Sequence, residues 1–445
     1  MSLHNTLPTI VVSNFAEAHV DFLGRAADPN EREDLINGES YHGDRTLLWA
    51  GDPKLVFVSY PVAHAEWITS RLNYPGTRHL APSQPTPYLS LDILREPALL
   101  QALVDYAGAE RRVQILPYAT TPEFLRLVKV LREEHQLTVL LPESPLPENL
   151  WVRDYVDTKS GFHLLASRWL ADAGSRLPLG IVCNTPQKAA RAARWFCERG
   201  ETCVIKADTG ESGIGFNIFS SCNTDLDESI EILRQNSYLN AEPILVEQFI
   251  SAKQQLSPSP EVFVPPLGQG EPYIMYPTQQ LFMKFGDFCG ILVSGEQFTQ
   301  PWYADLKRSS LAIARGLQEM GYVGHFDLDC VVDDEGQLYL LEVNARRTGG
   351  THVHDFAMHC IGEDYLDKVA LISHEANDSG RITQAGELME VLSDLLYPMN
   401  GEPRGVVVTI TTPLFKHHFG AIFVAPSVAE AQALQAQVQE RIRQA

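Results

Sequence analysis

The stretch that decides the fold runs from residue 326 to residue 350 and reads FDLDCVVDDEGQLYLLEVNARRTGG. Two largely apolar runs, 324–332 and 337–343, stand on either side of the segment Asp333-Asp-Glu-Gly336. Acidic residues followed by a glycine are typical of tight turns, so the pattern predicts two antiparallel strands that pair across this turn. The acidic residues of the turn itself are interpreted as solvated.

Three polar side chains interrupt the apolar runs. Asp329 lies on the first predicted strand, whereas Glu342 and Asn344 lie two residues apart on the second and therefore point to one face. If the strands pair across the turn, Asp329 can face both of them. Carboxylates on otherwise apolar strands are costly without a cation, and carboxylate and amide oxygens bind Mg²⁺ together with phosphate oxygens. The stretch therefore predicts a metal site at Asp329, Glu342 and Asn344.

A second chemical element comes earlier in the chain, where residues 204–216 read VIKADTGESGIGF. The apolar start predicts a strand that delivers Lys206, and Gly210, Gly213 and Gly215 make the following loop rich in glycine. Glycines let backbone N–H groups approach phosphate oxygens closely, and the lysine adds a positive charge. The P-loop pattern GxxxxGK[ST] is absent, and three glycines after a strand are, taken alone, more often only a turn.

In combination and in this order, Lys206 with its glycine loop, Asp329 and the run Glu342-Val-Asn-Ala-Arg346 resemble the ATP-grasp superfamily of ligases. The resemblance spans residues 151–355 and includes a counterpart of the first phosphate-binding lysine of that family, Lys159. In layout the chain is most similar to the ATP-grasp peptide ligases of natural-product pathways, such as the pheganomycin type.

The same resemblance implies a nucleotide-binding set between the lysines and the metal strands. The run Val246-Glu-Gln-Phe-Ile250 resembles the hinge that holds the adenine, with Glu247 as its acid and Phe249 and Ile250 beside it. Glu261 resembles the glutamate that holds the ribose hydroxyls. Lys284 is a further candidate for a phosphate contact.

The resemblance implies a reaction as well as a fold. ATP converts a carboxylate into an acyl phosphate, the amine of an amino acid or peptide attacks it, and ADP and phosphate are released. Arg346 and Lys206 are the implied catalytic residues because they stabilise charge on the transferring phosphoryl group. The implied cofactors are ATP and Mg²⁺, with Mn²⁺ as an alternative, and the partners are a small-molecule acid and amine.

Two other functions stay open at this stage. One is a kinase-type or carboxylase-type enzyme on the same scaffold, with an alcohol or bicarbonate as the phosphoryl acceptor. The other is a non-catalytic module that binds ATP, which the complete set of metal and phosphate residues disfavours. The segment after the metal strand, with His352 and His354, is predicted to be a loop that meets a substrate or merely supports the site.

The chain as a whole is predicted to be α/β, with an α+β grasp core. Residues 1–150 alternate short apolar runs with helical stretches, which predicts a βα pre-ATP-grasp domain. The ATP-grasp fold is expected to follow as a lid and nucleotide subdomain over 151–250 and a magnesium and substrate subdomain over 251–360. A small C-terminal extension covers 361–445. Within the third unit, residues 251–270 contain four prolines and predict a loop or an interrupted edge strand.

The bulk composition narrows the partners. The formal net charge of −21 argues against a surface that binds nucleic acid or anionic membrane. No apolar run long enough for a membrane span and no signal peptide are recognisable, and the seven cysteines show no metal-binding or disulfide spacing. These features predict a cytoplasmic protein with reduced thiols. The resemblance to the ligase family makes a homodimer through the N-terminal unit possible.

Overall fold

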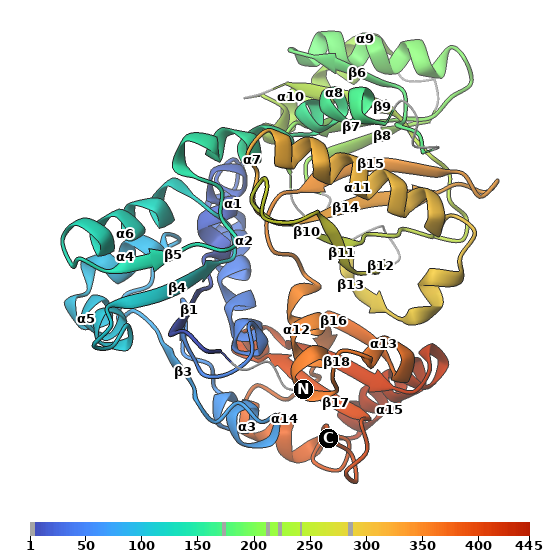
Figure 1. Ribbon diagram of the computed structural model, residues 1–445. Helices are drawn as coiled ribbons and strands as arrows, with labels where there is room; N and C mark the ends of the chain where they lie inside the picture. Colours follow the sequence, from blue (N-terminus) through green and yellow to red (C-terminus); the bar gives the residue numbers. More distant parts are fainter. Residues whose placement is uncertain (1–4, 171–174, 211–213, 221–224, 241–242, 284–287) are drawn as a thin grey trace.

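The computed structural model describes residues 5–170, 175–210, 214–220, 225–240, 243–283 and 288–445. Within these residues the strands form four main sheets. Figure 1 shows one sheet, built from the blue and teal N-terminal segments, beside a column of three others that follow the chain from green to red. The predicted α/β class is confirmed, since one sheet is parallel and the other three are antiparallel.

The N-terminal sheet is parallel and is covered on both faces. Ile10 and Val12 face an apolar cluster that includes α4 (Leu89–Arg95), α5 (Pro97–Tyr106) and α6 (Pro122–Glu133), whereas Val11 faces a second cluster. This two-sided burial explains why the segments 10–12 and 55–58 are unbroken apolar runs. In order, the strands are β3 (Thr77–Leu80), β2 (Lys54–Phe57), β1 (Thr9–Val12), β4 (Arg112–Pro117) and β5 (Thr138–Leu140).

The second sheet, called the lid sheet below, is antiparallel and lies at the top of Figure 1. The helices α9 (Pro186–Cys197) and α10 (Leu226–Gln235) pack on it. Thr185 caps the start of α9, because its side chain accepts a hydrogen bond from the backbone N–H of Lys188. The strands, in order, are β6 (Gly180–Cys183), β9 (Ile244–Gln248), β7 (Cys203–Ala207) and β8 (Phe216–Phe219).

The third sheet, called the central sheet, corrects one sequence prediction. Its order is β11 (Tyr273–Tyr276), β10 (Glu261–Val264), β14 (Gly324–Val332) and β15 (Leu338–Asn344). Residues 251–260 and 265–270 lie outside the helices and strands, as predicted for a loop, but 261–264 form β10, which pairs with β11 on one side and β14 on the other and is therefore not an edge strand. The prolines lie before and after the four-residue strand, where they remove no hydrogen bond from its ladder.

The fourth sheet, called the C-terminal sheet, joins segments that are far apart in the chain. Its strands are β12 (Gln279–Phe282), β13 (Phe288–Val293), β16 (Ala370–Asp378), β18 (His418–Ala425) and β17 (Gly405–Ile410), and α15 (Val428–Gln444) packs on it. Because β13 pairs with β16, hydrogen bonding crosses the predicted unit limit at residue 360. The unit limits at 150, 250 and 360 stay predictions.

Residues 345–350 after the metal strand form a loop, as predicted, but the part that contains His352 and His354 is a helix. Helix α12 (Thr351–Cys360) places Val353, Phe356 and Ala357 in the same apolar cluster as Val11 of the N-terminal sheet. Their spacing of three and four residues is typical of a buried helix face, and this signal was missed in the sequence. His352 and His354 are both buried on this helix. Among the residues that the model describes, no helix is both long and apolar enough to cross a membrane.

Candidate functional site

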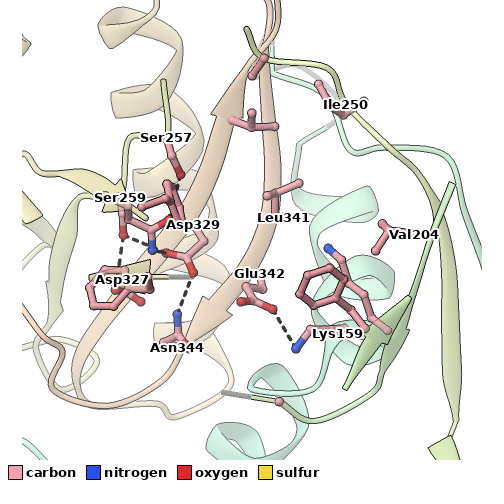
Figure 2. Close-up of a pocket in the computed structure, with 18 of the residues that line it drawn as sticks. Lys159, Val204, Ile250, Ser257, Ser259, Asp327, Asp329, Leu341, Glu342 and Asn344 are labelled. Atoms are coloured by element: carbon pink, nitrogen blue, oxygen red, sulfur yellow. Dashed lines mark hydrogen bonds and ion pairs between the residues drawn. The ribbon is translucent and has the colours of Figure 1, made fainter. Parts of the chain in front are cut away.

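A cavity of about 540 Å³ lies between the lid sheet and the central sheet and extends to the C-terminal sheet. Figure 2 shows Lys159 and Val204 on one side of it and Asp327, Asp329 and Asn344 on the other. Most of the predicted site residues that the structure describes line this cavity: Lys159, Lys206, Gly210, Glu247, Phe249, Ile250, Asp329, Glu342, Asn344 and Arg346. Gly213 and Lys284 lie outside the described residues.

The predicted strand pair forms with the expected register. Asp329 lies directly opposite Glu342 in the ladder between β14 and β15. Asn344 Nδ2 donates a hydrogen bond of 3.3 Å to Asp329 Oδ2. Ser259 Oγ and Gln280 Nε2 donate to Asp329 Oδ1 at 2.9 and 2.8 Å. The predicted convergence of two carboxylates and an amide is therefore confirmed as geometry, and their metal role stays a prediction.

The sequence argument missed Asp327. It lies opposite Asn344 and two residues before Asp329, so it points to the same face, by the rule that linked Glu342 to Asn344. Ser259 Oγ donates to Asp327 Oδ2 at 3.3 Å. Its Oδ1 is buried and takes no hydrogen bond from any residue that the structure describes. A buried carboxylate oxygen of this kind is costly unless a cation or donor meets it.

Electrostatics on this face distinguish the three carboxylates. Burial, with the negative charge of Asp329, raises the pKa of Asp327 well above its ordinary value. Burial and the charge of Glu342 raise the pKa of Asp329 to about 7. Burial acts in the same direction on Glu342, but Lys159 and Lys206 outweigh it and lower the pKa of Glu342. The raised pKa values of Asp327 and Asp329 mean that this face disfavours further carboxylate charge on its own, and a bound cation would favour the charged forms of both groups.

Both predicted phosphate-binding lysines form ion pairs with acids of the cavity. Lys159 Nζ lies 2.9 Å from Glu342 Oε2, and Lys206 Nζ lies 2.6 Å from Glu247 Oε1. Lys159 is the first residue of α8 (Lys159–Trp169), and the residue before it, Thr158, is the N-cap whose side chain accepts from Gly161 N. Thr158 thus starts the helix that carries Lys159.

Residues between β7 and the glycine loop also hold the first turn of α8 in place. Asp208, directly after β7, accepts hydrogen bonds from the backbone N–H and the hydroxyl of Ser160 at 2.7 and 2.8 Å. Its backbone oxygen accepts from Lys159 N at 2.8 Å. A Cβ atom added at Gly210 would lie 3.1 Å from Lys159 Nζ, so the missing side chain leaves room for the ammonium group. The strand that carries Lys206 therefore also positions Lys159.

Two predicted nucleotide residues have other positions than the resemblance implied. Gly215 does not line the cavity; its φ of +82° and the 3.0 Å between an added Cβ and the Cβ of Tyr238 explain the glycine. Glu261 is buried and is also absent from the cavity wall. Its carboxylate accepts hydrogen bonds from side chains on three neighbouring segments: His325, Tyr276, Thr348 and Thr351.

The contacts of Glu261 identify it as part of a buried charge network. His325 Nδ1 lies 2.6 Å from Glu261 Oε1, and His325 Nε2 lies 3.4 Å from Glu143 Oε1. Burial opposes the charged forms, but these contacts outweigh it: the pKa of Glu261 is lowered to about 2 and that of His325 is raised to about 9. Glu261 is thus held as a carboxylate beside an imidazolium, with no oxygen turned to the cavity for a ribose.

This charge pair predicts how stability depends on alkaline pH. A His325 pKa of about 9, above its ordinary value of 6.5, contributes stability below pH 6.5 that is lost as the pH rises through about 9. We expect the free energy of unfolding to fall by on the order of 1–3 kcal/mol over this interval. The fall is measured as a lower melting temperature. His325→Gln should flatten this slope, and the exposed His417→Gln should leave it unchanged. Equal slopes in wild type and His325→Gln would contradict the assignment.

The two arginines after the metal strand have separate surroundings. Arg346 lines the cavity, donates from Nη2 to Asn344 Oδ1 at 3.2 Å, and lies 5.4 Å above the ring of Tyr118. Arg347 points away from it and forms a bidentate pair with Glu143 at 2.7 and 2.8 Å. Glu143 precedes Pro145 and Pro147 in the connection after the N-terminal unit. Arg346 can therefore act in the cavity, whereas Arg347 ties that connection to the central sheet.

The oxygen donors fit a hard divalent cation. Asp329, Glu342 and Asn344 offer carboxylate and amide oxygens, the ligand type of Mg²⁺, and Asp327 adds a buried oxygen without a partner among the described residues. Within the described part of the chain no group of three or more His, Cys, Asp or Glu side chains is arranged as a metal site by itself. A cation at this face would need further ligands from a bound molecule.

The chain was compared with known proteins. No family model matches it. The butirosin acyl-carrier protein–L-glutamate ligase of Niallia circulans is 23% identical over 228 residues, which are 50% of this chain and 52% of that protein. The match therefore spans about half the length of this relative.

Solved structures match over almost the whole chain. N5-carboxyaminoimidazole synthetase from Staphylococcus aureus has a TM-score of 0.55 and 10% identity, covering 99% of this chain and 100% of that one. The biotin carboxylase domain of 2-oxoglutarate carboxylase from Hydrogenobacter thermophilus has a TM-score of 0.54 and 14% identity, covering 99% and 94%. That structure contains magnesium ADP and bicarbonate. At these identities the likeness shows a shared fold.

Proposed function

Because the chain has the ATP-grasp fold, we propose that it is an ATP-dependent ligase that activates a carboxylate as an acyl phosphate and joins it to an amino-acid or peptide amine. The observation that carries the proposal is the convergence of Lys159, Lys206, Asp329, Glu342 and Arg346 on one cavity. This set supplies cations for phosphate and oxygen ligands for a metal in the same space. ADP and phosphate are the expected co-products.

The nucleotide base is expected at the hinge end of the cavity. Val204, Leu341 and Phe249 give apolar walls there. Glu247 Oε2 is buried and has no hydrogen-bond partner among the described residues, so it can accept from the adenine amino group. Lys206 is paired with the other oxygen of Glu247, and we expect its ammonium group to turn toward the phosphates when nucleotide binds.

Nucleotide binding requires that the ion pairs be rearranged. Lys159 holds Glu342, so a phosphate group that takes over the ammonium of Lys159 releases that carboxylate for a metal. Asn344 Nδ2 points to Asp329 while its Oδ1 meets Arg346, so the amide must turn over to offer its oxygen beside Asp329. This turn breaks the hydrogen bond from Arg346 Nη2 and leaves the guanidinium available to the substrate.

The chemistry then follows from the charges. Mg²⁺, held by Asp329, Glu342 and Asn344, would neutralise negative charge on the phosphate oxygens. Lys206 and Arg346 stabilise the charge that develops on the transferring phosphoryl group, and removing one such donor typically costs about 10²–10³-fold in rate. Glu342 and Lys159 would separate only when nucleotide is bound, which links metal binding to nucleotide binding.

The missed residue Asp327 provides a test of the metal face. Asp327→Asn removes a buried carboxylate whose oxygen lacks a partner among described residues, so the melting temperature should rise or stay unchanged. The Mg²⁺ concentration needed for half-maximal ADP formation should rise by about 10- to 100-fold, as for residues that support metal ligands. The exposed turn variant Asp334→Asn serves as the control. An unchanged Mg²⁺ requirement would remove Asp327 from the site.

A screen of amino acids and dipeptides for ADP formation tests the ligase activity. ADP should form only when an acid and an amine are both present, with phosphate released in equal amount. Phosphate retained on the product would favour the kinase-type alternative, and ATP binding without turnover would favour a non-catalytic module. The carboxylate and amine that the screen selects would define the natural substrates.

A further inference from the structure

A polar cluster lies just beyond the cavity wall, where the N-terminal unit meets the C-terminal sheet. Arg45 comes from the 3₁₀ helix η1 (His42–Leu48), and Glu375 comes from β16. Arg45 Nη1 donates to Glu375 Oε1, while His42 lies near both Glu375 and Glu39 at 3.8 and 3.7 Å. None of these residues was singled out in the sequence, because the partners are 330 positions apart.

Arg45 uses little of its hydrogen-bonding capacity. Its side chain is 4% exposed and rests over the ring of Phe15 at 5.1 Å. A guanidinium carries five N–H donors, yet among the described residues only Nη1 has an acceptor, and the buried Nε has none. Leaving buried donors of a charged group unsatisfied is costly, so a structural ion pair alone explains this arrangement poorly.

Glu375 leaves an acceptor unused beside these donors. The ladder between β16 and β18 passes from His374 opposite Ala421 to Asn377 opposite Phe419, which places an extra residue in β16 at Glu375 and Ala376. Bulges of this kind turn a side chain away from its usual direction. Glu375 Oε2 lies 3.8 Å from His42 Nε2, beyond hydrogen-bonding distance, and the hydrogen bond from Arg45 goes to the other oxygen, Oε1.

The cluster adjoins the catalytic end of the cavity. A Cβ atom added at Gly349 would lie 3.3 Å from Glu375 Oε1 and 3.6 Å from Phe288, and both Gly349 and Phe288 line the cavity. The absent side chain of Gly349 thus leaves the carboxylate close to the cavity. On the other side, a stack of Arg45, Phe15 and Tyr118 leads to Arg346.

We propose that Arg45 is a specificity-determining residue that binds the free carboxylate of the amine-bearing substrate, with Glu375 holding the guanidinium in place. This inference rests on the proposed ligase function. The unused edge of a guanidinium matches a carboxylate with two parallel hydrogen bonds. A substrate carboxylate fixed there keeps the amine of an amino acid or peptide directed to the cavity past Gly349. The enzyme therefore discriminates against amines that lack a carboxylate.

A competition between two acceptor types tests this inference. The protein is given ATP, Mg²⁺ and equal mixtures of the twenty common L-amino acids and their C-terminal amides, and products are counted by mass spectrometry. Wild type should form free dipeptides in preference to dipeptide amides. Arg45→Gln should lower this product ratio by about 10- to 100-fold, the value of hydrogen bonds to a charged group. A ratio that Arg45→Gln leaves unchanged overturns the proposal.

Further variants separate recognition from damage to the fold. Arg45→Gln combined with Glu375→Gln removes both charges and should lower the same ratio without leaving one of them unpaired. Arg441→Gln, on α15, breaks an exposed bidentate pair with Asp394 and should leave the ratio at the wild-type value. Gly349→Ala places a methyl group against Glu375 and should raise the KM for amino-acid acceptors while the KM for ATP stays unchanged.

A binding measurement distinguishes failure of this inference from failure of the ligase function. The melting temperature is recorded with the amino-acid mixture and with the amide mixture, in wild type and in Arg45→Gln. Amino acids should stabilise the wild type more than amides do, and Arg45→Gln should reduce that difference. If the wild type forms no product at all, the proposed ligase function is wrong. The melting temperatures then still show whether Arg45 binds a carboxylate. Equal stabilisation by both mixtures overturns the assignment.

Discussion

A Glu342→Ala variant should form ADP at least about 10²- to 10³-fold more slowly than wild type, by analogy with the loss of one preorganised electrostatic contact. Two effects combine at this position. The substitution removes an oxygen ligand of the proposed metal face, and it also removes the partner of Lys159, at 2.9 Å. The rate is measured as ADP formation at saturating ATP and Mg²⁺, with the substrates found in the screen.

The fold should survive this substitution, because the Glu342 side chain is 27% exposed and has cavity on one side. Its negative charge is one cause of the raised pKa of Asp329, so the pKa of Asp329 should fall in the variant. Glu335→Ala, on the exposed turn between the same strands, is the matched control and should keep the wild-type rate. A Glu342→Ala enzyme with wild-type activity would disprove the metal assignment.

The metal strands were predictable from the sequence because the information there is local. Asp329 and Glu342 are joined by one tight turn, so strand alternation and the turn together fix which residues face each other. The same alternation places Asp327 on the face of Asp329, so Asp327 could have been predicted from the sequence as well. Helix starts are also local: the side chains of Thr121 and Thr185 each accept a hydrogen bond from a backbone N–H in the first turn of the helix that follows them.

Contacts between distant segments were not predictable from one sequence. Glu261 was assigned to ribose from its order in the chain, yet three segments meet it with hydrogen-bond donors and hold it away from the cavity. The prolines near β10 suggested an edge, but strand position depends on which strands pair on both sides. Arg45 and Glu375 likewise meet only because the N-terminal unit packs on the C-terminal sheet.

The second large effect is expected on stability, at Arg347. Its side chain is 4% exposed, forms a bidentate pair with Glu143, and has Asp355 Oδ2 at 3.4 Å from Nη1. Breaking a buried ion pair by removing one partner typically costs about 3–5 kcal/mol, and here Glu143 would stay buried without its bidentate partner, keeping His325 at 3.4 Å as a charged neighbour. Arg347→Leu should therefore lower the melting temperature and the urea midpoint strongly. The exposed Arg441→Leu should change stability by about 0–1 kcal/mol.

The sign of the pH dependence distinguishes a charge effect from lost packing. In the wild type, burial opposes ionisation of Glu143, but Arg347 and His325 outweigh it and lower its pKa. Its charge therefore contributes stability above its ordinary pKa, 4.5, which is lost as the pH falls through the lowered value. Without Arg347, only His325 of these two still opposes burial, so the pKa of Glu143 should be higher in the variant than in the wild type. Protonation of Glu143 as the pH falls should therefore cost the variant less stability. The difference in melting temperature between wild type and Arg347→Leu should therefore become smaller from pH 7 to about pH 5. A difference that stays constant would instead assign the lost stability to packing of Arg347 against Trp49.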